Sequence, residues 1–224
     1  MNKTVKMNTL IVSAHPEPAS FGGQLVKVAT ETLEQLNHTV RSIDLYAKAF
    51  DPVMRASQFS PRKDTNYFET MAEQAHQSER GLTSGDVKIS QEQLLWCENL
   101  LLHFPLWWWS MPAMMKGWIE RVFAADFAYG KQNLAGRRAL LLVTAETKGE
   151  RFAIEGGAHP LHHIERGMLR FCGFEVLPAF VIADVWKLTQ AQRSQRLSDL
   201  PLHLRRAFAD SRSETKGPPR GDAK

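Results

Sequence analysis

The chain has 224 residues, an ordinary length for a single α/β domain. Hydrophobic residues make up 43% and charged residues 23%, which is the balance of a folded globular protein and excludes a disordered or fibrous chain. The 28 basic residues outnumber the 24 acidic residues without forming a dense basic stripe, so nucleic-acid binding is not indicated. Two cysteines are too few for a disulfide framework or a cysteine zinc site.

The sequence also predicts where the protein works. Its longest apolar stretch, residues 100–115, is broken by a histidine, two prolines and a serine, so no membrane span is expected. The N-terminal region has only a short apolar run and lacks the pattern of a secretory signal. We therefore expect a cytoplasmic protein with reduced cysteines.

Strand and helix patterns alternate along the chain, as in the βαβ units that build a mainly parallel sheet. In chain order we expect a strand at 8–14, a helix at 20–36, a strand at 39–45, a helix at 90–96, a strand at 99–105, a helix at 110–123, a strand at 138–144, a helix at 160–171, a strand at 174–184 and a helix at 189–208. Ser20 and Ser90 are suitable N-caps for the helices that begin there. Five strands with helices between them predict a doubly wound sheet.

Two stretches interrupt this alternation. Residues 48–90 have few apolar residues and no clean period, and a connection this long inside a compact domain is usually functional. After residue 210 the composition turns to Ser, Gly, Pro and charged residues, which predicts a flexible tail over 210–224. The expected organisation is therefore one domain over residues 1–209, with a long connection at 48–90.

The first candidate site is the segment HPEPASFGG at residues 15–23, between the first strand and its helix. Ligands of doubly wound sheets lie outside the carboxyl ends of the strands. A helix start there offers unpaired N–H groups and a positive dipole end, to which Ser20 adds a hydroxyl and His15 a ring donor. An anion site and a capped loop without ligand fit this segment equally well. The fingerprints of Rossmann and Walker phosphate loops do not occur at this position.

The second candidate site is the run FPLWWWSMP at residues 104–112, after the most apolar strand. Three consecutive tryptophans cannot all face one core, so at least one is expected to line a cleft and to offer a flat wall for a planar ligand. The alternative is that they pack beneath residues 48–90.

Two further features are weaker signals. The loop at 144–152 carries hydroxyl groups and backbone N–H groups near the end of the fourth strand, but by itself it has the composition of an ordinary loop. His159 and His163 have a spacing found in zinc sites, yet no third ligand of a suitable type is placed beside them. We therefore predict no metal site.

Together these segments resemble a known family. The stretches HPEPASFGGQL, IDLYAKAFDP, HFPLWWWSMPAMMKGWIERVFAADFAYG and MLRFCGFEVL are similar to NAD(P)H:quinone oxidoreductases of the DT-diaphorase type. The likeness is collinear from about Thr9 to Phe208, and the run F-P-L-x-W-x-x-x-P-A-x-x-K-G-W-x-x-R-V is its most specific part. It implies an α/β fold, the flavodoxin-like three-layer doubly wound five-stranded parallel sheet.

The resemblance also implies roles for individual residues. At the flavin pyrophosphate it places His15, Ser20, Phe21 and Gly22. At the isoalloxazine it places Pro105, Leu106, Trp107, Trp108, Trp109, Thr144, Ala145, Glu146 and Thr147. As catalytic residues it suggests Tyr129, reaching in from a neighbouring subunit, and His159. Because the sites of the family lie between subunits, a homodimer is expected.

Four positions depart from the family pattern. Gly22 stands where an asparagine is common, so one side-chain contact is missing. Trp107 replaces a glutamine or tyrosine and reshapes the aromatic wall. Ala145 and Glu146 stand where the family places small, uncharged residues of a T-T-G-G segment. A carboxylate there disfavours the negative charge of a reduced flavin.

The implied reaction is a ping-pong transfer of two electrons. NAD(P)H delivers a hydride to the flavin, and a quinone then takes the same place and accepts the electrons. FAD is expected rather than FMN, because the long 48–90 segment and the full-length likeness suit the FAD-binding members. The quinone and the choice between NADH and NADPH stay open.

Three alternatives come from other functional classes. Some family members are ancillary subunits of bacterial potassium-efflux transporters, which would make a transporter the partner. A one-electron flavodoxin-type carrier is usually acidic, and the positive net charge argues against it. The third alternative is a relative that kept the fold and lost the flavin, which the change at Ala145 and Glu146 permits.

Overall fold

The computed structural model describes residues 6–131, 133–152 and 159–208, and its centre is a six-stranded parallel sheet. The long strands are β1 (Met7–Ser13), β2 (His38–Asp44), β3 (Asn99–Pro105) and β4 (Arg138–Thr144). The short strands β5 (Glu175–Val176) and β6 (Phe180–Ile182) both pair with β4. The order β2-β1-β3-β4-β5 confirms the predicted flavodoxin-like fold.

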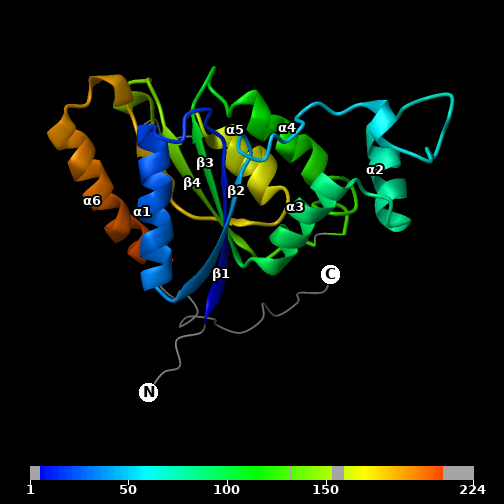
Figure 1. The fold of residues 1–224 in the computed structure, drawn as a ribbon, viewed down its shortest axis with the longest axis horizontal. Coiled ribbons are helices and arrows are strands. Elements are labelled where there is room, and N and C mark those ends of the chain that lie inside the picture. Colours follow the sequence, from blue (N-terminus) through cyan, green and yellow to red (C-terminus); the bar gives the residue numbers. More distant parts are fainter. Residues whose placement is uncertain (1–5, 132, 153–158, 209–224) are drawn as a thin grey trace, which may run out of the picture.

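Helices cover both faces of this sheet and complete the three layers (Figure 1). On one face α1 (Phe21–Gln35) packs against α6 (Gln190–Ala207). On the other face lie α3 (Gly85–Trp96), α4 (Ala113–Val122) and the short α5 (His162–Ile164). The helix α2 (Thr70–Glu79) lies at the outer end of this second layer (Figure 1).

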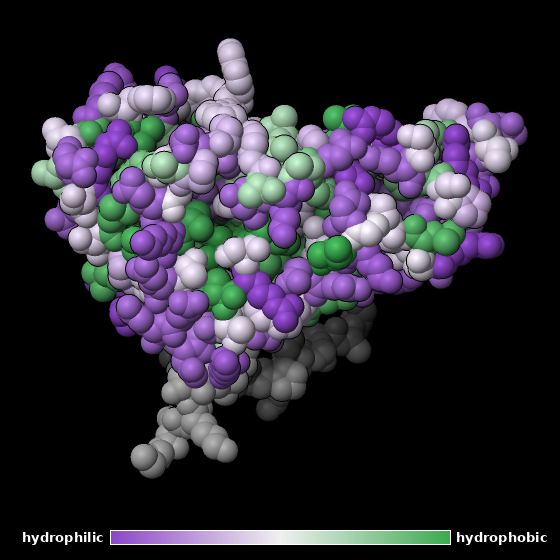
Figure 2. All heavy atoms as spheres, in the orientation of Figure 1, coloured by the Kyte–Doolittle hydropathy of each residue, from purple (hydrophilic) through white to green (hydrophobic). Residues whose placement is uncertain are grey.

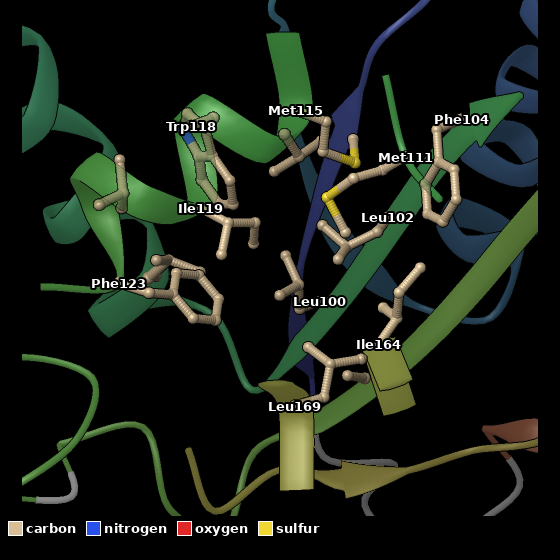
Figure 3. Close-up of a cluster of buried hydrophobic side chains, with 14 of the residues drawn as sticks. Leu100, Leu102, Phe104, Met111, Met115, Trp118, Ile119, Phe123, Ile164 and Leu169 are labelled. Atoms are coloured by element: carbon tan, nitrogen blue, oxygen red, sulfur yellow. The ribbon is translucent and has the colours of Figure 1, made fainter. Parts of the chain in front are cut away.

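The strand β3 is buried along its whole length, because it has a strand on each side and helices on each face. Its side chains alternate between two apolar clusters, as the period of a strand requires. Leu100 and Leu102 face α4, where Figure 3 shows Met115 and Trp118 turned toward the sheet. Leu101 packs with the helices of the opposite face. The apolar run of this strand therefore holds both outer layers together.

The last predicted strand, 174–184, is divided into β5 and β6. The intervening Pro178 has no N–H group to donate to β4, so the ladder is interrupted there. The predicted helix at 90–96 is also longer than expected, since α3 begins at Gly85 after its N-cap residue Ser84. Ser90 is not a cap: it lies inside the helix, and its hydroxyl accepts a hydrogen bond from Trp118 Nε1 at 3.2 Å.

Other boundaries differ for local reasons. The supposedly irregular segment 48–90 contains α2, whose N-cap residue Glu69 accepts backbone hydrogen bonds from the first turn. The predicted helix at 160–171 consists of α5 followed by a π-helical segment, Glu165–Arg170. Ser20 caps α1 and Thr189 caps α6, close to the predicted starts.

The predicted single domain over 1–209 stays a prediction, and the predicted tail at 210–224 lies outside the described residues. Within the ranges that the structure describes, no helix is both long enough and apolar enough to cross a membrane. On the face drawn in Figure 2, hydrophilic residues predominate and hydrophobic residues form smaller patches.

Candidate active site

A cavity of about 480 Å³ lies at the carboxyl edge of the sheet, where four loops meet. The loop after β1 contributes to it, as do the loops after β3, β4 and β6. The order of the strands brings these loops together, because β1 and β3 are adjacent and their connections leave on opposite faces. The lining residues are His15, Glu17, Ser20, Phe21, Gly22, Pro105, Leu106, Trp107, Thr144, Ala145, Glu146, Val185, Trp186 and Arg193.

The loop after β1 forms an anion cradle, defined here as His15, Ser20 and the N-terminus of α1. Ser20 Oγ accepts a hydrogen bond from the Gly23 N–H at 3.1 Å, which leaves its own proton available to a ligand. His15 is held by its Nδ1, which lies 3.0 Å from the backbone nitrogen of Glu17. The unpaired N–H groups of the first turn and the positive end of the helix dipole favour a phosphate here.

The loop after β3 separates the three tryptophans. Trp107 lines the cavity beside Pro105 and Leu106. Trp108 and Trp109 do not line it: they form the tip of a tight turn, with 97% and 51% of their surface exposed. Their predicted position beside the isoalloxazine therefore depends on the backbone of the turn and not on their rings. The Trp107 ring lies 6.3 Å from the His15 ring, so the aromatic wall adjoins the anion cradle.

The loop after β4 places Thr144, Ala145 and Glu146 on the cavity wall. The Glu146 side chain is exposed, and Ala145 is held by a hydrogen bond from its N–H to the Ile182 carbonyl at 2.8 Å. Thr147, which was also expected at the isoalloxazine, is not among the residues that line this cavity, and its carbonyl accepts a hydrogen bond from the Asp184 N–H at 3.1 Å. The charge that the sequence introduces at Glu146 is therefore next to the cavity.

Four lining residues were missed by the sequence reasoning, and three of them follow the last strand: Val185, Trp186 and Arg193. The Arg193 guanidinium donates to the carbonyls of Val185 and Leu188 and lies 5.1 Å from the centre of the Phe21 ring. Val185 and Trp186 could have been found from the sequence, because they directly follow the last strand and its carboxyl end lies at the same edge of the sheet. The fourth, Glu17, belongs to the cradle loop itself.

Tyr129 lies elsewhere. It lines a second cavity of about 410 Å³ with Met71 and Phe171, and its ring is 5.7 Å from that of Phe171. Burial, and to a lesser degree nearby ionisable groups, raises the pKa of Tyr129. Within one chain the structure does not bring this residue to the first cavity, and its predicted role requires a neighbouring subunit.

His159 also lies outside the first cavity. Its Nε2 is 3.3 Å from a carboxylate oxygen of Glu165, and its ring meets that of His162 edge to face. The histidine that contacts the tryptophan turn is His163, whose Nε2 lies 3.3 Å from Ser110 Oγ. In the described part of the chain, no group of three or more His, Cys, Asp and Glu residues is arranged to hold a metal ion.

The first cavity fits a flavin in two respects. The anion cradle supplies hydrogen-bond donors without a carboxylate in its first helical turn, which suits a phosphate. Trp107 and Leu106 supply an apolar wall for a planar ring, and glycine at position 22 keeps the cradle open. The residues present therefore match a ligand that carries both a phosphate and an aromatic ring system.

Comparisons with known proteins agree with this geometry. A family model described as a flavodoxin-like fold matches residues 7–202. A ribosyldihydronicotinamide dehydrogenase-like protein from Penicillium crustosum is 36% identical over 201 residues, which cover 81% of this chain and 74% of that protein. NAD(P)H dehydrogenase (quinone) 1 from Rattus norvegicus is 30% identical over 213 residues, which cover 90% of this chain and 78% of that enzyme.

A solved structure supports the same assignment. The crystal structure of a candidate quinone reductase from Klebsiella pneumoniae superimposes with a TM-score of 0.84 at 34% identity, covering 91% of this chain and 86% of that chain. The chain therefore belongs to the flavodoxin-like NAD(P)H:quinone oxidoreductase family.

Proposed function

We propose that this protein is a flavin-dependent NAD(P)H:quinone oxidoreductase. The observation that carries the proposal is the single cavity that joins a phosphate-binding helix start, Ser20 and Phe21, to an apolar wall at Leu106 and Trp107. The names of the relatives described above support an oxidoreductase over the ancillary subunit of a transporter. A cytoplasmic location is part of the same proposal.

The chain would contribute binding, orientation and exclusion of water. The N-terminus of α1 and the Ser20 hydroxyl would hold the phosphate, and Arg193 would add positive charge on the same side. Trp107 and Leu106 would keep water from one face of the planar slot. A bound flavin supplies the hydride chemistry, which no amino-acid side chain provides. One slot would serve NAD(P)H and then the quinone, so the kinetics would be ping-pong.

FAD is proposed over FMN because the lining continues past the anion cradle to Trp186 and Arg193. The Trp186 side chain is 75% exposed, and stacking on such a ring stabilises a nucleic-acid base by about 1–3 kcal/mol. We expect Trp186→Ala to weaken FAD about tenfold or more and to leave FMN within about twofold, with Trp186→Phe keeping most of the FAD affinity. Equal losses for both flavins would contradict the choice of FAD.

The proposed enzyme is a homodimer in which Tyr129 of one subunit steadies charge at the site of the other. Support comes from the second cavity, where Met71 and Phe171 leave 54% and 64% of their surfaces exposed beside Tyr129. His159, held by Glu165, is the proposed second group that steadies charge. Analytical ultracentrifugation of wild type and Phe171→Arg tests the dimer: we expect a dimer for the first and a monomer for the second.

The test of the proposed function begins with the colour of the purified protein. We expect bound flavin, or flavin uptake when the protein is incubated with FAD or FMN, followed by NAD(P)H oxidation that depends on an added quinone. Parallel lines in double-reciprocal plots of initial rate against NAD(P)H concentration, measured at different quinone concentrations, would support the ping-pong order. A preparation that stays colourless with both flavins would overturn the proposal and favour a relative that lost the cofactor.

A further inference from the structure

One buried polar side chain next to the anion cradle has no hydrogen-bond partner among the residues that the structure describes. His103 lies on β3, on the face that α1 covers, and is 1% exposed. Among the described residues, neither its Nδ1 nor its Nε2 has a hydrogen-bond partner. A buried polar group without a hydrogen-bond partner lowers the stability of the folded state by about 1–3 kcal/mol, so its presence needs a physical explanation.

The ring of His103 is directed at Gly22 in the first turn of α1. A Cβ atom placed on Gly22 would lie 2.6 Å from His103 Nε2 and 2.7 Å from Cε1, which is closer than such atoms can approach. The same point is 3.6 Å from Ser20 Oγ. Gly22 lines the cavity on its other side. The imidazole therefore lies directly behind the cradle and is separated from it by a residue that has no side chain.

Burial keeps this imidazole uncharged. Desolvation first, and the nearby charge of His15 second, lower the pKa of His103 to about 3. A neutral imidazole carries one N–H donor and one acceptor nitrogen. It can therefore offer a donor to an anion at neutral pH without placing an uncompensated charge in the core.

We propose that His103 belongs to the anion cradle, and that its Nε2 donates a hydrogen bond to a phosphate oxygen of the ligand at the N-terminus of α1. Glycine at position 22 is then required, because any Cβ there displaces the imidazole. This inference rests on the proposed flavin site and adds to it a binding residue from the interior of the sheet.

Phosphate binding by His103 predicts a combination of effects that is not expected if the imidazole only fills space in the core. In the free protein the unsatisfied nitrogens are a cost, so His103→Leu, which keeps the bulk and removes both nitrogens, should raise the unfolding temperature. In the complex the phosphate satisfies Nε2, so the same variant should bind phosphate ligands more weakly. A histidine that only fills space would show the gain in stability without the loss of affinity, so the loss of affinity is the readout that distinguishes the two roles.

Calorimetric titration of the flavin-free protein with three probes tests this. FAD carries both the isoalloxazine and the pyrophosphate. ADP carries the pyrophosphate without the isoalloxazine, and riboflavin carries the isoalloxazine without any phosphate. We expect His103→Leu to weaken FAD and ADP about tenfold, as for the loss of a hydrogen bond to a charged group, and to leave riboflavin unchanged. His103→Gln, which keeps an N–H donor, should stay within about threefold of wild type.

Two further readouts complete the test. Gly22→Ala should weaken ADP as His103→Leu does, and the ¹⁵N resonance of His103 Nε2 should shift when wild type binds ADP. Unchanged FAD and ADP affinity in His103→Leu, or an equal loss for riboflavin, would overturn the role of His103 and leave the flavin site intact. A wild-type chain that takes up neither flavin nor ADP would overturn both proposals.

Discussion

Trp107 and Ser110 are joined by two backbone hydrogen bonds, with N–O distances of 2.9 and 3.0 Å. They close a turn in which Trp108 and Trp109 have φ angles of 49° and 62°. Such turns usually carry asparagine and glycine, because bulky residues are strained at positive φ. The turn holds Trp107 in its position on the cavity wall and leaves Trp108 exposed to solvent.

Replacing Trp108 by glycine should therefore stabilise the protein. The left-handed conformation costs a bulky residue about 1–3 kcal/mol. The entropy of glycine in the unfolded chain offsets up to about 1 kcal/mol of this gain. We expect urea denaturation to show a net gain of about 1 kcal/mol for Trp108→Gly.

The matched control is Trp186→Gly. Trp186 is also exposed but is not among the residues with positive φ, so Trp186→Gly should lower the stability of the protein. A loss of stability in both variants would show that the turn is not strained.

Glu146 should lower the midpoint potential of a bound flavin, because this residue lines the cavity and its negative charge would oppose the negative charge of the reduced ring. Two unit charges 4 Å apart interact by about 4 kcal/mol at an effective dielectric constant of 20. A quarter of that energy, about 1 kcal/mol, corresponds to about 20 mV for a two-electron couple. Glu146→Gln should thus raise the midpoint in a redox titration by about 20 mV or more.

Glu150→Gln is the control for this titration, since Glu150 is exposed and lies outside the cavity lining. Its midpoint should match that of wild type. Identical midpoints for all three proteins would mean that the loop after β4 directs its charge away from the flavin.

Gly117 should be essential for the packing of α4. A methyl group there would lie 2.0 Å from the Pro52 carbonyl oxygen, which is a backbone atom and cannot turn aside. Gly117→Ala should therefore lower the free energy of unfolding by about 1–3 kcal/mol, as overpacking does. Gly85→Ala in α3 serves as control, because its added Cβ has no atom within 4 Å among the described residues outside its own helix, and alanine favours a helix there. Equal stabilities of the two variants in urea would contradict this packing.

Asp86 should make stability depend on pH through its ion pair with Arg121, in which Nη1 and Oδ2 are 2.6 Å apart. Burial acts to raise the pKa of Asp86, but hydrogen bonds from Arg121 and Ser84 outweigh it and hold the pKa below the ordinary 3.8. The stabilising contribution is therefore complete above the unfolded-state pKa and is lost as the pH falls through the folded-state pKa.

At pH 7, Asp86→Asn should lose about 1–2 kcal/mol of stability, less than a fully buried pair because 41% of the Asp86 side chain is exposed. The difference from wild type should shrink in urea titrations carried out below about pH 3.8. Asp199→Asn, which removes the exposed partner of Arg196, should be neutral at every pH. A deficit of Asp86→Asn that persists unchanged in acid would exclude the ion pair as its cause.

The architecture could be predicted from the sequence, because the helices and strands are specified by short-range patterns of residues. Alternating apolar runs and helical periods reflect the backbone geometry of each element, and Ser20 marks the start of α1 through its own side chain. Parallel strands then place their carboxyl ends at one edge, so the candidate site segments after β1, β3 and β4 could be located there from the sequence. The division of the last strand at Pro178 was also readable in principle, because proline has no N–H group.

What the sequence could not determine was the direction of individual side chains within those loops. The sequence does not distinguish between three adjacent tryptophans. The turn from Trp107 to Ser110 nevertheless places only Trp107 on the cavity wall. Arg193 reaches the same wall because α6 packs beside α1. The contact of His103 with Gly22 depends on how closely α1 lies on β3. Such contacts are set by the packing of whole layers, and only the tertiary structure decides them.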